Sequence, residues 1–267
     1  MTPDEFLGRV TGEGDEPAFA FGRHLHGAFG GVFGGALAAA TVSVARHAAP
    51  GRAPASLDCR FVRALPAGRA RARASVLHGG RSMTTVVVDL VDERDRTTTH
   101  STVTLVDRAA LARRTVDVPA PDWVAATADA ADGRPWPQPP GFEAPIIDTL
   151  APRAVDTDRG APVTTAIDVP WDDPDASAEA VCLAADLCVG PPVALACRGT
   201  RLAHPNPDLS LRFAAAAVDV DDAAASLVAA GRLVSVDAGV ATVAVEVAAG
   251  GRVVAVGVSF SVLLEAA

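Results

Sequence analysis

Apolar residues follow one arrangement twice along the chain. In the first half, a short strand and a glycine-rich turn at 19–35 lead into an alanine-rich segment at 35–49, whose length and apolar character predict a buried helix. Four strands are then predicted, at 55–65, at 69–80 with alternating Arg and Ala, and at 81–93 and 96–108, which are rich in β-branched residues. The second half repeats the order, with a strand at 162–171, a helix at 178–196 broken near Pro191 and Pro192, and strands at 209–220, 224–239, 241–249 and 252–264.

The repeat extends to local sequence and predicts the fold class. Leu57–Phe61 reads LDCRF and Leu209–Phe213 reads LSLRF, and each begins the first strand after the helix of its half. A strand, a long apolar helix and four strands per half predict an α+β double hotdog fold, with two antiparallel sheets each wrapped around a long buried helix. Pairing of the two sheets into a continuous one would cover edge strands that otherwise invite aggregation.

A segment rich in proline, alanine and acidic residues separates the two halves. Its lack of any sustained period is incompatible with a helix or a central strand. We therefore expect an N-terminal hotdog domain at 1–107, a linker at 108–160 and a C-terminal hotdog domain at 161–267. Trp123, Trp136 and Phe142 provide large apolar surfaces that should hold the linker against the domains.

Composition and charge exclude several classes of partner. The 267 residues are 49% hydrophobic, and the net charge of -9 and pI of about 5.1 argue against nucleic-acid binding. Neither a long uninterrupted apolar run nor a signal-peptide pattern is present, so we expect a cytoplasmic protein with no membrane partner. Cys59, Cys182, Cys188 and Cys197 lack the spacing of a zinc site, and we expect no metal and no cofactor.

Three segments in each half, in matching order, resemble the acyl-CoA thioesterase II (TesB-like) family. In the first half these are FGGVFGGALAAA, SLDCRFVRALPAG and LHGGRSMTTVVVDLVD, and in the second half AVCLAADLCVGPPVAL, PNPDLSLRF and GGRVVAVGVSFSVLL. The resemblance spans nearly the whole chain and implies a double hotdog thioesterase that hydrolyses an acyl-CoA to free acid and CoA.

The resemblance places the catalytic acid at Asp186, within LAADL of the second helix. A carboxylate in an apolar cleft has a raised pKa and can orient or deprotonate an attacking water. The alternative is an acid that caps the helix or faces solvent. Asn206 falls where the family has a hydroxyl residue, and Ser259 falls where it has a glutamine; a slip in register would bring in Ser210 or Ser261 instead, and His204 is a further possible base.

Binding residues are implied at two turns. Gly34 and Gly35 would expose backbone N–H groups at a helix N-terminus, and Gly80, Arg81 and Ser82 would lie near the nucleotide end of CoA, with ordinary turn roles as the alternative for both. The first helix has no acid between Gly34 and Ala45, so we expect one active site per chain. Asp58 stands where relatives often have a histidine.

The leading function is thus acyl-CoA hydrolysis in lipid metabolism by a homo-oligomer. The alternative is a catalytically degenerate hotdog protein that binds acyl-CoA or a related small molecule, because the hydroxyl and glutamine residues are missing. A hotdog hydratase or dehydratase is disfavoured, since neither segment that precedes a helix carries the Asp and His pair of those enzymes.

Overall fold

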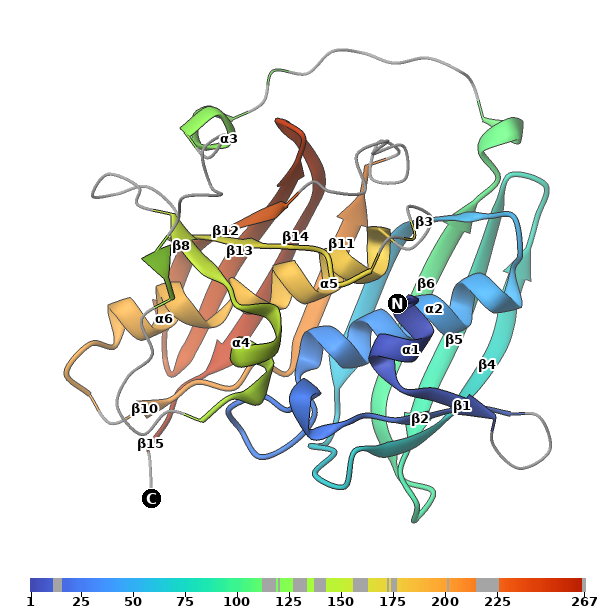
Figure 1. The fold of residues 1–267 in the computed structure, drawn as a ribbon, viewed down its shortest axis with the longest axis horizontal. Helices are drawn as coiled ribbons and strands as arrows, with labels where there is room; N and C mark the ends of the chain where they lie inside the picture. Colours follow the sequence, from blue (N-terminus) through green and yellow to red (C-terminus); the bar gives the residue numbers. More distant parts are fainter. Residues whose placement is uncertain are drawn as a thin grey trace.

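The computed structural model describes all of residues 1–267 except 12–15, 112–118, 120, 127–133, 137–142, 156–162, 172, 174–176, 201, 215–225 and 266–267. In the first half, helix α2 lies across a group of strands (Figure 1). The elements of this half are α1 (Pro3–Leu7), β1 (Arg9–Thr11), β2 (Pro17–Ala20), the 3-10 helix η2 (Arg23–Leu25), α2 (Gly34–Ala48), β3 (Ala53–Phe61), β4 (Arg69–Gly79), β5 (Met83–Val91) and β6 (Thr97–Val106).

The second half repeats this arrangement around α5, as the sequence predicts. The predicted break in the helix is confirmed, because α5 ends at Leu187 and α6 begins at Gly190 with Pro191 and Pro192 in its first turn, where proline is tolerated. The elements are β9 (Val163–Ile167), α5 (Ser177–Leu187), α6 (Gly190–Ala196), β10 (Leu202–Ala203), β11 (Asp208–Phe213), β12 (Leu227–Asp237), β13 (Val240–Ala249), β14 (Arg252–Val262) and β15 (Leu264–Glu265).

One antiparallel sheet of 13 strands joins the two halves, in place of the two separate sheets of the predicted fold class, so the expected pairing of those sheets into a continuous one is confirmed. Its order is β1-β2-β4-β5-β6-β3-β11-β14-β13-β12-β9-β8-β7, and the two halves join where β3 pairs with β11. The repeated segments LDCRF and LSLRF are therefore paired with each other, with Cys59 opposite Leu209 and Leu57 opposite Leu211. This pairing satisfies backbone groups that would otherwise be exposed at the edge of each half.

The segment predicted as a linker contains short helices and strands, so the expectation that it forms no helix is wrong. Its described residues form the 3-10 helix η3 (Arg108–Ala110), α3 (Asp122–Ala126), β7 (Arg134–Pro135), α4 (Pro145–Leu150) and β8 (Arg153–Val155). Strands β8 and β7 extend the sheet beyond β9 to its edge, where proline is tolerated. Trp123 and Trp136 pack against the apolar core, as expected, whereas Phe142 lies outside the described residues.

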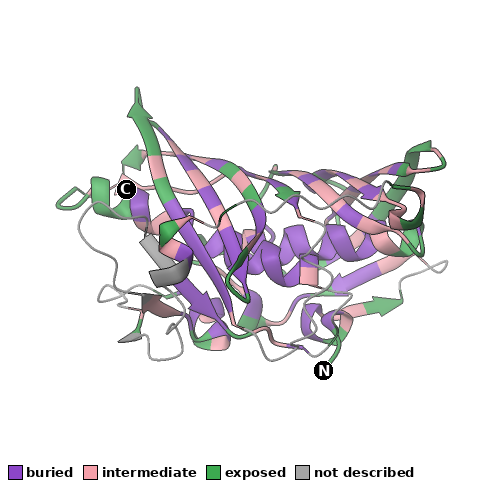
Figure 2. Ribbon diagram, turned by 90° about the horizontal axis from the view of Figure 1, so that it is seen from above, coloured by how far each residue is buried: buried purple, intermediate pink, exposed green. Residues whose placement is uncertain are grey.

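The core is continuous across the two halves. Helices α2 and α5 contact each other and lie against the inner face of the sheet, and Figure 2 shows that both are buried almost all round. The α5–α6 segment, Ser177–Ala196, is long and apolar enough to cross a membrane, but 78% of its most apolar window is buried inside the protein, as in the core helix of a folded domain.

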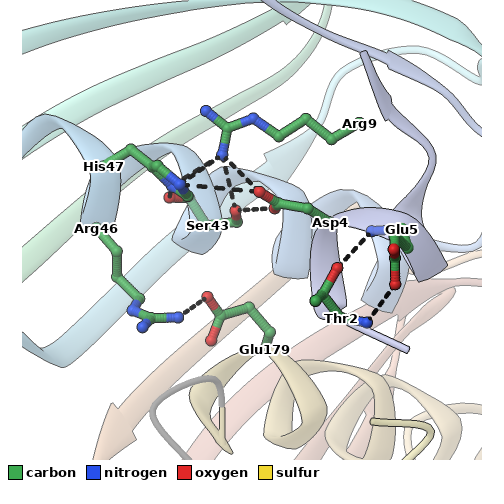
Figure 3. A network of polar contacts seen from close by, with 8 residues as sticks. All are labelled: Thr2, Asp4, Glu5, Arg9, Ser43, Arg46, His47 and Glu179. Carbon is green, nitrogen blue, oxygen red and sulfur yellow. Dashed lines mark hydrogen bonds and ion pairs between the residues drawn. The ribbon is translucent and has the colours of Figure 1, made fainter. Parts of the chain in front are cut away.

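A polar network joins α1, α2 and α5 at the end of α2 that is remote from Gly34 (Figure 3). Asp4 accepts a hydrogen bond from Ser43 Oγ at 2.8 Å, and Arg9 Nη1 lies 3.1 Å from the Asp4 carboxylate. Arg46 Nη1 donates to Glu179 Oε1 at 2.8 Å. The two central helices are therefore linked by an ion pair as well as by apolar packing.

Candidate active site

Asp186 is a buried carboxylate held by two hydrogen bonds from different parts of the fold. It lies in the last turn of α5 and is only 6% exposed. The Gly35 backbone N–H at the start of α2 donates to Oδ2 at 2.7 Å, and the Asn206 side chain, from the loop before β11, donates to Oδ1 at 2.7 Å. Each carboxylate oxygen is thus held by its own hydrogen bond inside the protein, which contradicts the alternative of a solvent-facing helix acid.

Close approach of the two helices explains the glycines at the start of α2. A Cβ on Gly34 would lie 2.8 Å from Asp186 Oδ2 and 2.8 Å from Cε2 of Phe61. On Gly35 it would lie 2.9 Å from the Cys182 carbonyl oxygen, which belongs to the backbone of α5. Only glycine lets the N-terminus of α2 come this close to the carboxylate. Gly34 and Gly35, predicted as binding residues, are therefore in direct contact with Asp186.

Burial makes Asp186 a weaker acid than usual. The loss of solvation raises its pKa from 3.8 to about 6; the hydrogen bonds from Asn206 and Gly35 act in the opposite direction, and the negative charge of Asp208 adds to the increase. At neutral pH the carboxylate is largely ionised and can accept a proton. Because its pKa is near neutral pH, it can both take a proton from a reacting water and release it again. Asp186 is therefore suited to act as a general base.

Ser259 lies beside this pair, but its hydroxyl has a different partner. The residue is buried on β14, and its Oγ donates to the Asp208 carbonyl oxygen at 2.6 Å. The same carbonyl accepts a second, longer hydrogen bond of 3.3 Å from Asn206 Nδ2. The structure thus brings Asp186, Asn206 and Ser259 into one network, in which Asp208 is the connecting residue.

The other polar candidates have different surroundings. Ser210 lies on β11 between Leu209 and Leu211, which are fully buried, so it faces away from the helices, whereas Ser261 is buried on the same face of β14 as Ser259. Burial lowers the pKa of His204, whose ring contacts the edge of Phe29. Among the described residues, no hydrogen bond joins His204 or Ser261 to Asp186.

The turn Gly80–Ser82 is not brought to Asp186. It connects β4 to β5, and Met83 pairs with Val106, which in turn pairs with Ala53 at the start of β3. The site lies instead beside Phe61 at the other end of this nine-residue strand. With a rise of about 3.3 Å per residue, the ends of the strand are roughly 26 Å apart.

The cysteines provide no nucleophile for this site. Burial raises the pKa of the Cys59 and Cys188 thiols to about 12, and raises that of Cys182 well above its ordinary value. Cys188 Sγ donates to the Ala229 carbonyl oxygen at 3.0 Å. All three residues are buried, and a thiol that stays protonated is a poor nucleophile. In the described part of the chain, no group of three or more His, Cys, Asp and Glu side chains is placed to hold a metal ion.

Two residues of the site were not predicted from the sequence. Asp208 connects the network, and its carboxylate is paired with Arg60 of β3. A signal was present, because Asp208 lies two residues after Asn206 at the start of a strand whose polar residues alternate with buried apolar residues, where an unpaired acid would be costly. Its partner is 148 residues away in the sequence, and only the β3–β11 register brings the two together.

Comparisons with known proteins agree with this architecture. Residues 24–106 match the family described as acyl-CoA thioesterase N-terminal domain. A comparison with curated protein sequences finds no match.

Solved structures match over nearly the whole chain. A hot dog fold protein of unknown function from Alicyclobacillus acidocaldarius has a TM-score of 0.75 at 18% identity, with 99% of this chain and 98% of that one covered. The acyl-CoA thioesterase II TesB2 from Mycobacterium marinum has a TM-score of 0.71 at 18% identity, with 100% and 98% covered. The tesB protein of Mycobacterium avium subs paratuberculosis has a TM-score of 0.70 at 18% identity, with 98% of each chain covered. The resemblance to the thioesterase family is confirmed for residues 24–106, and the solved structures show that the hotdog fold extends over both halves.

Proposed function

We propose that this chain, whose residues 24–106 match the acyl-CoA thioesterase N-terminal domain, hydrolyses an acyl-CoA thioester to free acid and CoA at Asp186. The observation that carries the proposal is the buried Asp186 carboxylate, held by the Gly35 N–H and Asn206, with a pKa of about 6. A base of this strength, fixed at a helix N-terminus, fits the activation of a water molecule.

In the proposed reaction, Asp186 accepts a proton from a water whose oxygen forms a bond to the thioester carbonyl carbon. The carbon–sulfur bond then breaks, and the proton held by Asp186 passes to the departing thiolate, so that the carboxylate is regenerated. Asn206 orients Asp186 through its amide N–H and offers its carbonyl oxygen to the water. Ser259, which already donates to Asp208, can accept a hydrogen bond from the same water.

The substrate-binding role of Gly34 and Gly35 belongs to the same proposal. Because the Gly35 N–H donates to Asp186, we propose that Gly35 orients the base. We propose that Gly34, which has no side chain, leaves room for the thioester to approach Asp186. Gly80, Arg81 and Ser82 remain the predicted contact for the nucleotide end of CoA. The division into domains at 1–107 and 161–267, the cytoplasmic location, the place in lipid metabolism and the homo-oligomeric state likewise remain proposals.

A degenerate acyl-CoA binder is the second candidate, because Asn206 and Ser259 replace a hydroxyl residue and a glutamine. To separate the two functions, the protein is supplied with short, medium and long acyl-CoAs, and released thiol and binding are both measured. Hydrolysis predicts multiple turnovers of at least one chain length. Saturable binding of an acyl-CoA with no thiol release at any chain length would favour the binder, and hydration of an enoyl-CoA without thiol release would indicate a hydratase.

A further inference from the structure

Asp208 occupies the junction of three strands beneath the candidate site. It is the first residue of β11 and is 6% exposed. Its carbonyl oxygen accepts from Ser259 Oγ at 2.6 Å and from Asn206 Nδ2 at 3.3 Å. The positions of both polar companions of Asp186 therefore depend on where the backbone of Asp208 lies.

The Asp208 carboxylate fixes that backbone position. Oδ1 accepts a hydrogen bond from the Phe260 N–H of β14 at 2.9 Å, and Oδ2 forms an ion pair with Arg60 of β3. Since Phe260 directly follows Ser259, one carboxylate sets the position of β14 at the serine and links it to β3 and β11. Charge-assisted hydrogen bonds of this kind are stronger and more directional than neutral ones.

Charge at Asp208 also reaches Asp186. The negative charge of Asp208 acts to raise the pKa of Asp186, and Arg60 partly neutralises this charge. The other titratable groups that act on Asp186 or lie near it are the thiols of Cys59 and Cys182, which burial keeps protonated and neutral. The Arg60–Asp208 pair is therefore the principal source of formal charge beside Asp186 among the described residues.

We propose that Asp208 and Arg60 form a positioning pair for acyl-CoA hydrolysis: Asp208 holds Asn206 and Ser259 in place around Asp186, and Arg60 balances the charge that Asp208 places there. The proposal rests on the proposed function. Neither residue needs to touch the substrate, because both act through Asp186 and its two polar neighbours.

This arrangement predicts opposite effects of two substitutions. Asp208→Asn retains an oxygen that can accept from the Phe260 N–H, but it removes the negative charge and leaves Arg60 positive. The pH at which kcat/KM reaches half its plateau should then fall by about half a pH unit or more. Arg60→Gln leaves the Asp208 charge unbalanced, so the same midpoint should rise, but by less, because the Arg60 side chain is about half exposed.

The test is the pH dependence of thiol release by the wild type and these variants, with Asp58→Asn as the matched control. Asp58 pairs with Arg212 across the same two strands, but both side chains are about half exposed, so its loss should leave the pH profile unchanged. A third variant, Asp208→Ala, also removes the acceptor of the Phe260 N–H and should lower kcat about tenfold or more while KM changes little.

Shifts in opposite directions for Asp208→Asn and Arg60→Gln, with none for Asp58→Asn, would support the pair. Unchanged midpoints, or shifts of both variants in the same direction, would overturn it, since a merely structural role gives no such signature. The titration of the Asp186 carboxyl is also followed by ¹³C NMR in each variant. This readout needs no turnover, so it decides the charge role even if the wild type proves not to be a hydrolase.

Discussion

At the scale of single residues, the burial of Asp186 affects the stability of the fold as well as the proposed chemistry. Its pKa rises from 3.8 to about 6 on folding, so the folded state binds the proton more tightly than the unfolded chain. The contribution of this proton to the free energy of unfolding is fully present below about pH 4 and is lost as the pH rises through 6. A shift of about two units corresponds to roughly 3 kcal/mol.

Asp186→Asn removes this titration, so its effect on stability should depend on pH. We expect the free energy of unfolding of the variant, relative to the wild type, to increase by roughly 3 kcal/mol between pH 4 and pH 8. Urea unfolding at both pH values measures the difference. A difference that stays constant with pH would mean that Asp186 titrates in the folded protein as it does in the unfolded chain.

Gly34 provides a second prediction at this scale. Gly34→Ala places a Cβ 2.8 Å from Asp186 Oδ2 and from the ring of Phe61, so the carboxylate must move. We expect kcat/KM to fall about tenfold or more while the protein stays folded. The control is Gly190→Ala at the start of α6, where the nearest atom would be 3.7 Å away and activity should be retained. Equal activity of the two variants would contradict the role assigned to Gly34.

The sequence could suggest Asp186 and Asn206 as candidates, because both lie in short local segments that resemble the thioesterase family. It could not identify Asp208 and Arg60, because their importance comes from a pairing between strands of different halves. Nor could it show that the Gly35 N–H would be used by Asp186, since that contact depends on how closely α2 approaches α5. Local motifs thus indicated the chemical groups, and tertiary contacts determined their partners.

At the scale of elements, the contact between α2 and α5 includes a charge in the core. Glu179 is fully buried, and burial raises its pKa while Arg46 lowers it. Arg46→Met should leave this acid without its ion-pair partner and cost roughly 3–5 kcal/mol of stability near neutral pH. Glu179→Gln should cost less, because the charge that remains, on Arg46, is partly exposed whereas that of Glu179 is fully buried.

Chemical unfolding of both variants measures this asymmetry. The control is Arg73→Gln, which breaks an ion pair with Asp95 in which both side chains are about half exposed, and it should change stability by less than about 1 kcal/mol. If Arg46→Met and the control had equal effects, the ion pair between α2 and α5 would contribute nothing specific.

Elements with strong periodicity were predictable, and those in the proline-rich segment were not. Helix α2 follows from a continuous apolar run, and strands β5 and β6 follow from runs of β-branched residues, whereas β7 and β8 are too short to leave a pattern. Helix α4 has six residues, of which Ile146, Ile147 and Leu150 are buried. Such elements are stabilised by the domains against which they pack, so a local sequence reading treats them as loop.

At the scale of the whole molecule, the repeat is physically joined into one unit. The β3–β11 pairing makes a single sheet, and one apolar cluster includes residues of both halves. The repeat order and the joining of the two sheets could be predicted from the sequence, but the identity of the strands that meet, β3 and β11, could not. Neither half alone covers its edge strand or the exposed side of its central helix.

This continuity predicts one cooperative unfolding transition for the full chain. Differential scanning calorimetry should give a calorimetric enthalpy equal to the van't Hoff enthalpy. Hydrogen exchange provides a second check, because the backbone amides of β3 and β11 should be protected to a similar extent. Two separate transitions, or loss of protection in one half before the other, would show that the halves fold independently.

The proposed function depends on Asp186 acting as the base in thioester hydrolysis. Its most direct test is the rate of thiol release from the best acyl-CoA substrate at pH 8, for the wild type, Asp186→Asn and the exposed control Asp237→Asn. We predict a loss of about 10²-fold or more in kcat for Asp186→Asn alone, with folding and acyl-CoA binding retained. Turnover by Asp186→Asn at the wild-type rate would contradict the claim.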